Sequence, residues 1–306
     1  MKKILVTGGS GQVGKYLKDI MPNAIYISSK DYNLLVEEDV IKMYSELKPD
    51  TVIHLAARCG GIQFNVAHPV ELLEENVLMN TLVLKYAYKS NVKRFIGILS
   101  SCVYPDQVES YPMPESEIFN GPPPPTNFAY AISKRCLATQ IDSYNNQFGT
   151  KYSYLMPCNL YGEYDKFEEH HSHFVSALIK KIYECNNEVV NLYGTGKPLR
   201  QFMYTGDLAK IIKECIDKDI TDNFNVAPKE VYSIKEIAEI AISAVNKNYE
   251  VSFSNEGLDG QYRKDIDSSK LLSVLDNFKF TTLNDGIKKS YDYITNKWNK
   301  YDKVSN

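Results

Sequence analysis

The feature that most constrains the fold of this chain is a glycine-rich segment, VTGGSGQVG, at residues 6–14. It follows a short apolar run and precedes residues 12–21, which suit a helix. Its glycines, Gly8, Gly11 and Gly14, have GxxGxxG spacing. A glycine-rich turn between a strand and a helix brings backbone N–H groups and the helix N-terminus to one point, where they can bind a pyrophosphate. The segment therefore favours a dinucleotide site over a plain tight turn.

Strand-like and helix-like segments alternate through the first half of the chain, and the strands are nearly continuous apolar runs. That composition is expected when both faces of a parallel sheet are covered by helices. The pattern predicts an α/β fold with a Rossmann-type, doubly wound parallel sheet. The further strands are expected at 24–29, 51–57, 94–101 and 152–162, and the further helices at 36–49, 70–90 and 129–148.

Beyond residue 162 the pattern is less regular, with mixed helices and short strands. We therefore expect a dinucleotide-binding domain over residues 1–162 and a smaller α/β substrate domain over 163–306. The run FNVA at 224–227 looks like a strand, so the segment near 201–228 is expected to pack back on the first domain. No internal repeat is visible.

Composition excludes several classes of protein. The 306 residues carry a formal net charge of −3 and no long basic tract, so a nucleic-acid partner is not expected. The N-terminal apolar run is too short for a signal peptide, and no stretch reaches membrane-spanning length. Six scattered cysteines without a CxxC pair suggest reduced thiols. A cytoplasmic protein with no membrane partner is the expectation.

The choice of dinucleotide is made after the second strand, where folds that bind NAD commonly offer an acid to the ribose 2′-hydroxyl. Here the strand ends in SSK, so Ser29 and Lys30 would supply a hydroxyl and a cation to a 2′-phosphate. Asp31 follows immediately, and a solvated loop lysine is the alternative for Lys30. NADP(H) is the predicted cofactor. Further contacts are expected from Gln12, Val13, Leu55, Ala56, Ala57, Tyr130 and Lys134.

A second motif, YAISK, places Tyr130 and Lys134 on one face of a predicted helix. A nearby ammonium and a cationic nicotinamide ring would lower the pKa of the tyrosine from its ordinary value of about 10. Tyr130 could then protonate a carbonyl oxygen while Ser100 donates a hydrogen bond to the same oxygen. An isolated YxxxK also occurs by chance. Together with the glycine motif, the set resembles the catalytic centre of short-chain dehydrogenase/reductases.

The order and spacing of several motifs narrow this resemblance to the GDP-L-fucose synthase family of extended short-chain dehydrogenase/reductases. Members are 3,5-epimerase-4-reductases that use NADPH, act on GDP-4-keto-6-deoxymannose and form homodimers. The resemblance spans nearly the whole chain and implies that Ser100, Tyr130 and Lys134 reduce the carbon-4 ketone. The motifs are VTGGSGQVG, HLAARCGGI, SSCVYP, NGPPPPTNFAYAISK, PCNLYG, SHFVSALIKK and GTGKPLRQFMYTGDLA.

The same resemblance assigns the remaining site residues. Cys102 and His173 match the base and the acid of the epimerisation, and Arg200 matches the arginine that faces the nucleotide-sugar diphosphate. Asn159 is assigned to substrate binding, and Lys181 and Lys264 are weaker candidates for phosphate contacts.

Each assignment has a structural alternative. A lone cysteine such as Cys102 is normally a small buried side chain, and Arg200 follows a Gly/Pro turn, where exposed arginines are common. His54 is interpreted as a core histidine. The histidines of HHSH lack the i, i+4 ligand spacing of a helical metal site, so no metal is predicted. They are His170, His171 and His173.

The chain also departs from the family. GEYDKF stands where members commonly carry GPHDNF, which introduces Glu163, Tyr164 and Lys166 near the expected sugar pocket, and Cys158 replaces a usual threonine. Two alternatives therefore stay open. One is a carbon-4 reductase that acts on a GDP-4-keto-heptose after a separate epimerase, and the other is a non-reducing sugar-nucleotide 4-epimerase or dehydratase. A catalytically idle dinucleotide-sensing protein is disfavoured because all three reduction residues are present.

Overall fold

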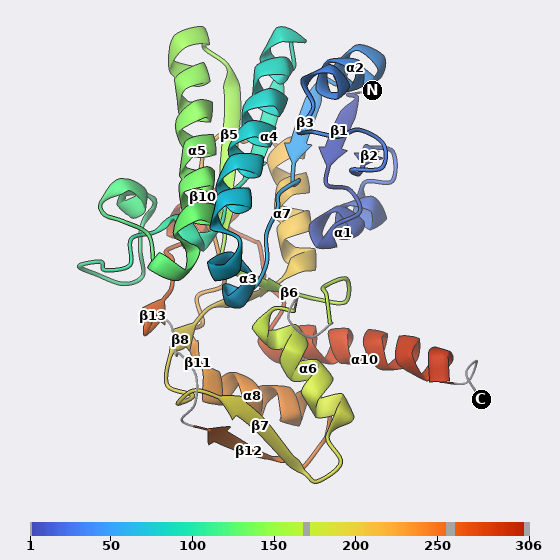
Figure 1. Cartoon of the computed structure of the whole chain (residues 1–306), viewed down its shortest axis with the longest axis vertical. Coiled ribbons are helices and arrows are strands. Elements are labelled where there is room, and N and C mark those ends of the chain that lie inside the picture. The colour runs from blue at the N-terminus through green and yellow to red at the C-terminus, as the bar shows by residue number, and fades with distance from the viewer. Residues whose placement is uncertain (1, 168–171, 255–260, 303–306) are drawn as a thin grey trace.

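A six-stranded parallel sheet forms the upper half of the molecule in the computed structural model, which describes residues 2–167, 172–254 and 261–302 (Figure 1). The strand order is β10-β5-β4-β3-β1-β2, with parallel pairing throughout. The doubly wound parallel sheet predicted from the sequence is confirmed. The strands are β1 Ile4–Thr7, β2 Ile25–Ile27, β3 Thr51–His54, β4 Arg94–Ile98, β5 Lys151–Pro157 and β10 Phe224–Val226.

Two pairs of helices cover this sheet. The long helices α4 and α5 pack against each other in front of the sheet in Figure 1, and α1 packs against α7. Local sequence sets two of the helix boundaries. α5 ends at Gly149, which adopts a left-handed φ of +66°, and α4 begins with Pro69 in its first position. The helices are α1 Gln12–Ile20, α2 Glu37–Leu47, α3 Ile62–Ala67, α4 Pro69–Lys89, α5 Phe128–Phe148 and α7 Thr205–Asp217.

Shorter sheets and helices form the lower half of Figure 1. β7 pairs with β12, β6 with β9, and β8 lies between β11 and β13. These strands are β6 Asn159–Tyr161, β7 Val189–Tyr193, β8 Leu199–Arg200, β9 Phe202–Tyr204, β11 Tyr232–Ser233, β12 Glu250–Ser254 and β13 Arg263–Lys264. The α-helices are α6 Phe174–Glu184, α8 Ile234–Ala244, α9 Ser269–Val274 and α10 Leu283–Asp302, and the 3₁₀ helices are η1 Ser101–Val103, η2 Glu115–Phe119 and η3 Pro125–Asn127.

The single strand expected at 152–162 is wrong, because the chain forms two strands there. β5 ends at Pro157, which has no N–H with which to continue the ladder. The N–H of Cys158 donates to Val226 O at 3.0 Å, and β6 then pairs with β9 in a different sheet. This break moves the chain from the upper sheet to the lower part of the molecule.

The chain later returns to the upper sheet through β10, which pairs with β5. Asn225, in the middle of β10, accepts a hydrogen bond from the buried Tyr104 hydroxyl at 2.6 Å and donates to Met113 O at 3.0 Å. These contacts connect three distant segments next to η1.

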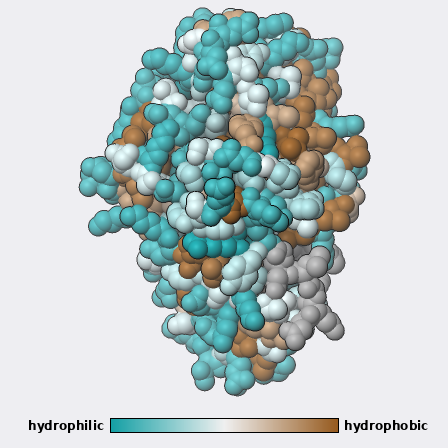
Figure 2. All heavy atoms as spheres, turned by 90° about the vertical axis from the view of Figure 1, so that its left-hand side faces the viewer, coloured by the Kyte–Doolittle hydropathy of each residue, from teal (hydrophilic) through white to brown (hydrophobic). Residues whose placement is uncertain are grey.

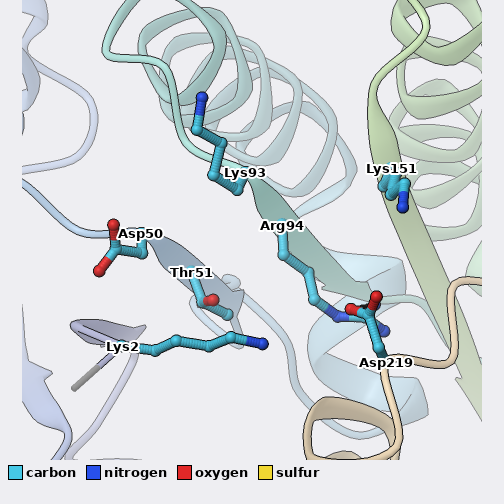
Figure 3. Close-up of a pocket in the computed structure, with 7 residues that line it drawn as sticks. All are labelled: Lys2, Asp50, Thr51, Lys93, Arg94, Lys151 and Asp219. Atoms are coloured by element: carbon cyan, nitrogen blue, oxygen red, sulfur yellow. Dashed lines mark hydrogen bonds and ion pairs between the residues drawn. The ribbon is translucent and has the colours of Figure 1, made fainter.

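A pocket of about 490 Å³ lies at the amino ends of β3, β4 and β5 (Figure 3). Thr51, Arg94 and Lys151 are the first residues of those strands. Ligands of doubly wound sheets bind at the opposite, carboxyl ends of the strands, so this pocket is not the candidate active site. None of the described helices is both long enough and apolar enough to span a membrane. The pocket is lined by Lys2, Asp50, Thr51, Lys93, Arg94, Lys151 and Asp219.

Candidate active site

The glycine turn at the carboxyl end of β1 depends on the absence of side chains. Gly8 has a left-handed φ of +68°, and a Cβ there would lie 2.8 Å from the backbone nitrogen of Ala56. A Cβ on Gly14 would lie 2.6 Å from Gly9 O. The Gly11 N–H donates to Gly8 O at 2.9 Å, and Gly11 directly precedes α1. The turn is thereby held against the residues that follow β3.

The residues around this turn fit a dinucleotide. The first turn of α1 contains no acidic residue, so its N-terminus can accept an anion. The Nε2 of Gln12 is buried and has no hydrogen-bond partner within the described part of the chain. Val13 is partly buried beside Gln12. Leu55, Ala56 and Ala57 follow β3 and are partly exposed on the other side of the turn.

The loop after β2 leaves a lysine exposed and occupies the neighbouring carboxylate. Asp31 accepts hydrogen bonds from the Ser28 N–H and Oγ, each at 2.8 Å, and these bonds lower the pKa of Asp31. Ser29 and Lys30 are exposed. The carboxylate of Asp31 is therefore occupied by hydrogen bonds within its own turn, whereas Lys30 faces solvent.

Tyr130 and Lys134 lie one helical turn apart on α5. The Lys134 ammonium donates to Ile98 O, the last residue of β4, at 2.6 Å and lies 5.8 Å from the centroid of the Tyr130 ring. Burial lowers the pKa of Lys134 to about 8. Burial, reinforced by the thiols of Cys59 and Cys102, raises the pKa of Tyr130 well above 10. In the protein alone the phenol is therefore protonated, and the lowered pKa expected beside a bound nicotinamide ring stays a prediction.

η1 follows β4 and presents Ser100 and Cys102. The N–H of Cys102 donates to Ser100 Oγ at 3.2 Å. The neighbouring Ser101 is buried, with 3% of its surface exposed. The Lys264 Nζ lies 3.2 Å from Cys102 Sγ, although 162 positions separate the two residues. Burial alone would raise the pKa of Cys102, but the Lys264 charge and hydrogen bonds from Ser100 and Lys264 outweigh it, so the net pKa lies below its ordinary value.

His173 directly precedes α6 and pairs with Asp165. The distance between His173 Nδ1 and Asp165 Oδ1 is 3.2 Å, and Ser176 Oγ donates to the second carboxylate oxygen at 2.5 Å. The hydrogen bond to Asp165 raises the pKa of His173, and the charge of Cys102 contributes in the same direction. Cys102 and His173 are thus close enough to influence each other's ionisation. The sequence analysis did not single out Asp165 as the partner of His173.

The loop substitutions expected near the sugar have different neighbours. Glu163 accepts hydrogen bonds from the Tyr16 and Tyr204 hydroxyls, so it joins α1 to β9. The Tyr164 hydroxyl donates to Asp19 of α1 at 3.2 Å. These two side chains hold the loop to α1. Lys166 is exposed and Cys158 is buried.

The predicted phosphate ligands are less closely grouped. The Lys181 Nζ donates to Asn191 O at 2.7 Å and lies over the Tyr193 ring, so its contacts are with β7. The Arg200 guanidinium donates to Leu199 O at 2.8 Å, and Asn159 donates to Gln201 O at 2.8 Å. Of these four predicted substrate ligands, Lys264 is the one that contacts the thiol of Cys102.

Among the described residues, His54 lies apart from this group. His54 is buried between the Thr7 hydroxyl at 2.7 Å and Asn80 at 2.9 Å, which confirms the predicted core histidine. His170 and His171 lie outside the described residues. Within the described ranges, no three His, Cys, Asp or Glu side chains are arranged to hold a metal ion.

Comparison with known proteins identifies the family. A model described as "NAD dependent epimerase/dehydratase family" matches residues 4–227. This chain belongs to the NAD dependent epimerase/dehydratase family. A GDP-L-fucose synthase from Dictyostelium discoideum is 35% identical over 94% of each chain, which confirms the family resemblance predicted from the motifs.

Two solved structures of related proteins have the same fold. A GDP-L-fucose synthetase from Naegleria fowleri bound to NADP is 29% identical, with a TM-score of 0.87 over 97% of this chain and 95% of its own. A GDP-6-OMe-4-keto-L-xylo-heptose reductase from C. jejuni is 25% identical, with a TM-score of 0.88 over 97% and 98%. The likeness therefore spans both the upper and the lower parts of the molecule.

Proposed function

We propose that this protein uses NADPH to reduce the carbon-4 ketone of a GDP-linked 4-keto sugar, in the manner of a GDP-L-fucose synthase. The observation that carries the proposal is the placement of Lys134 between Ile98 O and the Tyr130 ring, at the carboxyl end of the strand that also leads to Ser100. The glycine turn and Lys30 support NADP(H) as the cofactor. The relatives named GDP-L-fucose synthase support the substrate class.

The chain's own residues account for the proton in this reaction. When bound, NADPH would supply the hydride for carbon 4. Tyr130 is protonated in the protein alone and can give its proton to the ketone oxygen, while Ser100 donates a hydrogen bond to that oxygen. Lys134 lies close enough to stabilise the phenolate that remains.

Epimerisation at carbons 3 and 5 is part of the proposal. Both carbons flank the carbon-4 ketone, so their protons are acidified. Cys102 is assigned as the base that removes such a proton, and His173 as the acid that returns one to the opposite face. Their mutual electrostatic influence supports a shared site. Arg200, Lys264, Lys181 and Asn159 remain the proposed substrate ligands, in a cleft between domains 1–162 and 163–306.

A carbon-4 reductase acting on a GDP-4-keto-heptose is the second candidate. The C. jejuni heptose reductase has the same fold along nearly the whole chain. The substituted loop residues Glu163 and Tyr164 connect α1 to the loop before α6. In that case Cys102 would be a relic of epimerising relatives.

A cytoplasmic homodimer completes the proposal. Hydrophobic residues gather at the upper right of Figure 2. This edge corresponds to the front of Figure 1, where α4 and α5 lie. On α4, Val70 is 60% and Leu78 is 46% exposed, and on α5 Phe148 is 44% exposed. An apolar face of this kind fits a second copy of the same two helices.

The experiment that tests the function is incubation with NADPH and GDP-4-keto-6-deoxymannose, or its heptose counterpart, in deuterated water. Stoichiometric NADPH oxidation is expected with one of these sugars, and deuterium at carbon 3 or 5 would identify an epimerase-reductase. Reduction without deuterium at either carbon would select the second candidate. Turnover without external NADPH would instead identify a non-reducing epimerase or dehydratase.

A matched variant assigns the proton donor in the same experiment. Tyr130→Phe should lower reduction by about 10²–10⁴-fold, because only the proton donor is lost. Binding of NADPH, followed by its fluorescence, should change little. Unchanged reduction by this variant would refute the role given to Tyr130.

A further inference from the structure

A short paired strand places Lys264 beside Cys102. β13, which contains Lys264, pairs with β8, and the Leu199 N–H donates to Tyr262 O at 2.7 Å just before it. Just after it, the Met113 N–H donates to Asp265 O at 2.9 Å. The backbone at Lys264 is therefore held by pairing on both sides.

Of the two adjacent cations of β13, Lys264 is the one that contacts the thiol of Cys102. Arg263 is paired with Asp265 through two hydrogen bonds, at 2.7 and 3.0 Å, so its charge is compensated. Lys264 instead contacts Cys102 Sγ at 3.2 Å. Electrostatically, the thiol is also coupled to His173 of the α6 N-terminus, to Cys59 of the loop after β3 and to Tyr130 of α5. Ser100 adds its hydrogen bond from η1.

A second, opposite pair lies at the N-terminus of α6. Asp165 is 5% exposed and its carboxylate is oriented by Ser176, whereas the His173 side chain is 46% exposed. A carboxylate held in this way favours the cationic form of the imidazole. Lys166 acts weakly in the other direction. The two reactive groups thus meet counter-charges of opposite sign, contributed by different elements.

We infer that Lys264 and Asp165 are positioning residues: the Lys264 cation stabilises the thiolate form of Cys102, and the Asp165 carboxylate stabilises the imidazolium form of His173. The catalytic consequence rests on the proposed epimerisation. A carbon–hydrogen bond next to the ketone breaks, its proton passes to sulfur and its electron pair enters the enolate. A nitrogen–hydrogen bond of His173 then breaks as its proton adds to carbon. Exchange with solvent removes the proton from sulfur and restores the one on nitrogen.

The thiolate can be measured without any substrate. The rate of alkylation of Cys102 by iodoacetamide is followed against pH in the full chain, using mass spectrometry of the peptide that contains Cys102. An ordinary thiol gives an inflection near pH 8.5. We expect the inflection of Cys102 to lie below that value. In Lys264→Met the inflection should rise by about one pH unit, with roughly tenfold slower alkylation at neutral pH.

Two variants separate charge from structure. Lys264→Arg keeps the cation and should retain most of the low inflection. Lys270→Met removes a lysine that bonds to Asn223 O at 3.1 Å and should leave the inflection unchanged. An inflection in Lys264→Met equal to that of the unmodified chain would overturn the inference for Lys264. If Lys264→Met does not fold, an ordinary inflection in the unmodified chain would overturn it equally.

The histidine half has its own readout. The imidazole resonance of His173, assigned with His173→Gln, should titrate at lower pH in Asp165→Asn than in the unmodified chain. An unchanged titration would remove Asp165 from this role. If the alkylation and imidazole shifts are both observed but no 4-keto sugar incorporates deuterium, the electrostatic inference stands and the epimerase part of the proposed function fails.

Discussion

At the scale of single residues, burial decides the ionisation of the reduction group. The sequence places Tyr130 and Lys134 on one helix face, and the spacing correctly predicts their proximity. It cannot predict that Lys134 is 2% exposed, or that burial raises the pKa of Tyr130 rather than lowering it. Desolvation depends on what the rest of the chain packs over these groups, which local spacing does not encode.

The buried ammonium predicts a specific pH dependence of stability. The pKa of Lys134 is about 8 in the folded state, whereas its ordinary value is 10.5. Below pH 8 both states hold the proton and the folded protein bears the full cost of burying the charge. Between about pH 8 and 10.5 the unfolded chain holds more protons, so the contribution of Lys134 to stability rises with pH, by on the order of 3 kcal/mol in total.

Urea unfolding between pH 7 and 10 measures this effect when the unmodified chain is compared with Lys134→Met. The variant should lack the rise, so the difference between the free energies of unfolding should change across this range. A difference that stays constant with pH would show that Lys134 does not titrate in this way.

Cofactor preference also belongs to the residue scale. Because Asp31 is bonded to Ser28, Lys30 is the exposed charge next to the expected ribose. Lys30→Asp should weaken NADPH binding by about 1–3 kcal/mol, as expected for loss of a charge-assisted contact, and shift the preference toward NADH. The dissociation constants of both nucleotides test this, and an unchanged ratio would exclude Lys30 from phosphate binding.

At the scale of elements, the turn between β1 and α1 is the most predictable part of the molecule. Its glycines are required by close backbone approaches, which is why the motif could be recognised from sequence. The break between β5 and β6 was not predicted, because an apolar run through Pro157 and Cys158 reads as one strand until its hydrogen-bond partners are known. The pairing of His173 with Asp165 escaped for the same reason, since no local spacing marks it.

Gly14→Ala tests the turn. The added Cβ would lie 2.6 Å from Gly9 O, so the turn must shift, at a cost of about 1–3 kcal/mol in the free energy of unfolding. Binding of NADPH should weaken together with stability. Gly61→Ala is the matched control, because its nearest contact, Ser172 O, would be 3.8 Å away. Equal behaviour of the two variants would contradict the packing argument.

At the scale of the whole molecule, the surface of α4 and α5 stands out because large apolar side chains are exposed on it. Alternating strands and helices in the sequence predict that these helices cover the sheet. They do not predict which positions on α4 stay outside, because that depends on how α4 packs against α5.

Leu78→Glu should convert the expected dimer into monomers, because it places a charge in the apolar face. Sedimentation at micromolar concentration measures the change. Val274→Glu is the control, since Val274 is 41% exposed on α9, which packs against β10. A monomeric unmodified chain would refute the dimer itself.

The return of the chain through β10 has a consequence for synthesis on the ribosome. The upper sheet lacks its last strand until residue 226 has been made, because β10 comes from far beyond the other five strands. Until then β5 is an unpaired edge, open to association with other nascent chains. Asn225 also supplies the partners of Tyr104 and Met113 O, beside η1. A fragment that stops before β10 would therefore be prone to aggregate, and the segment bearing Ser100 and Cys102 would lack its support until Val226 has been added.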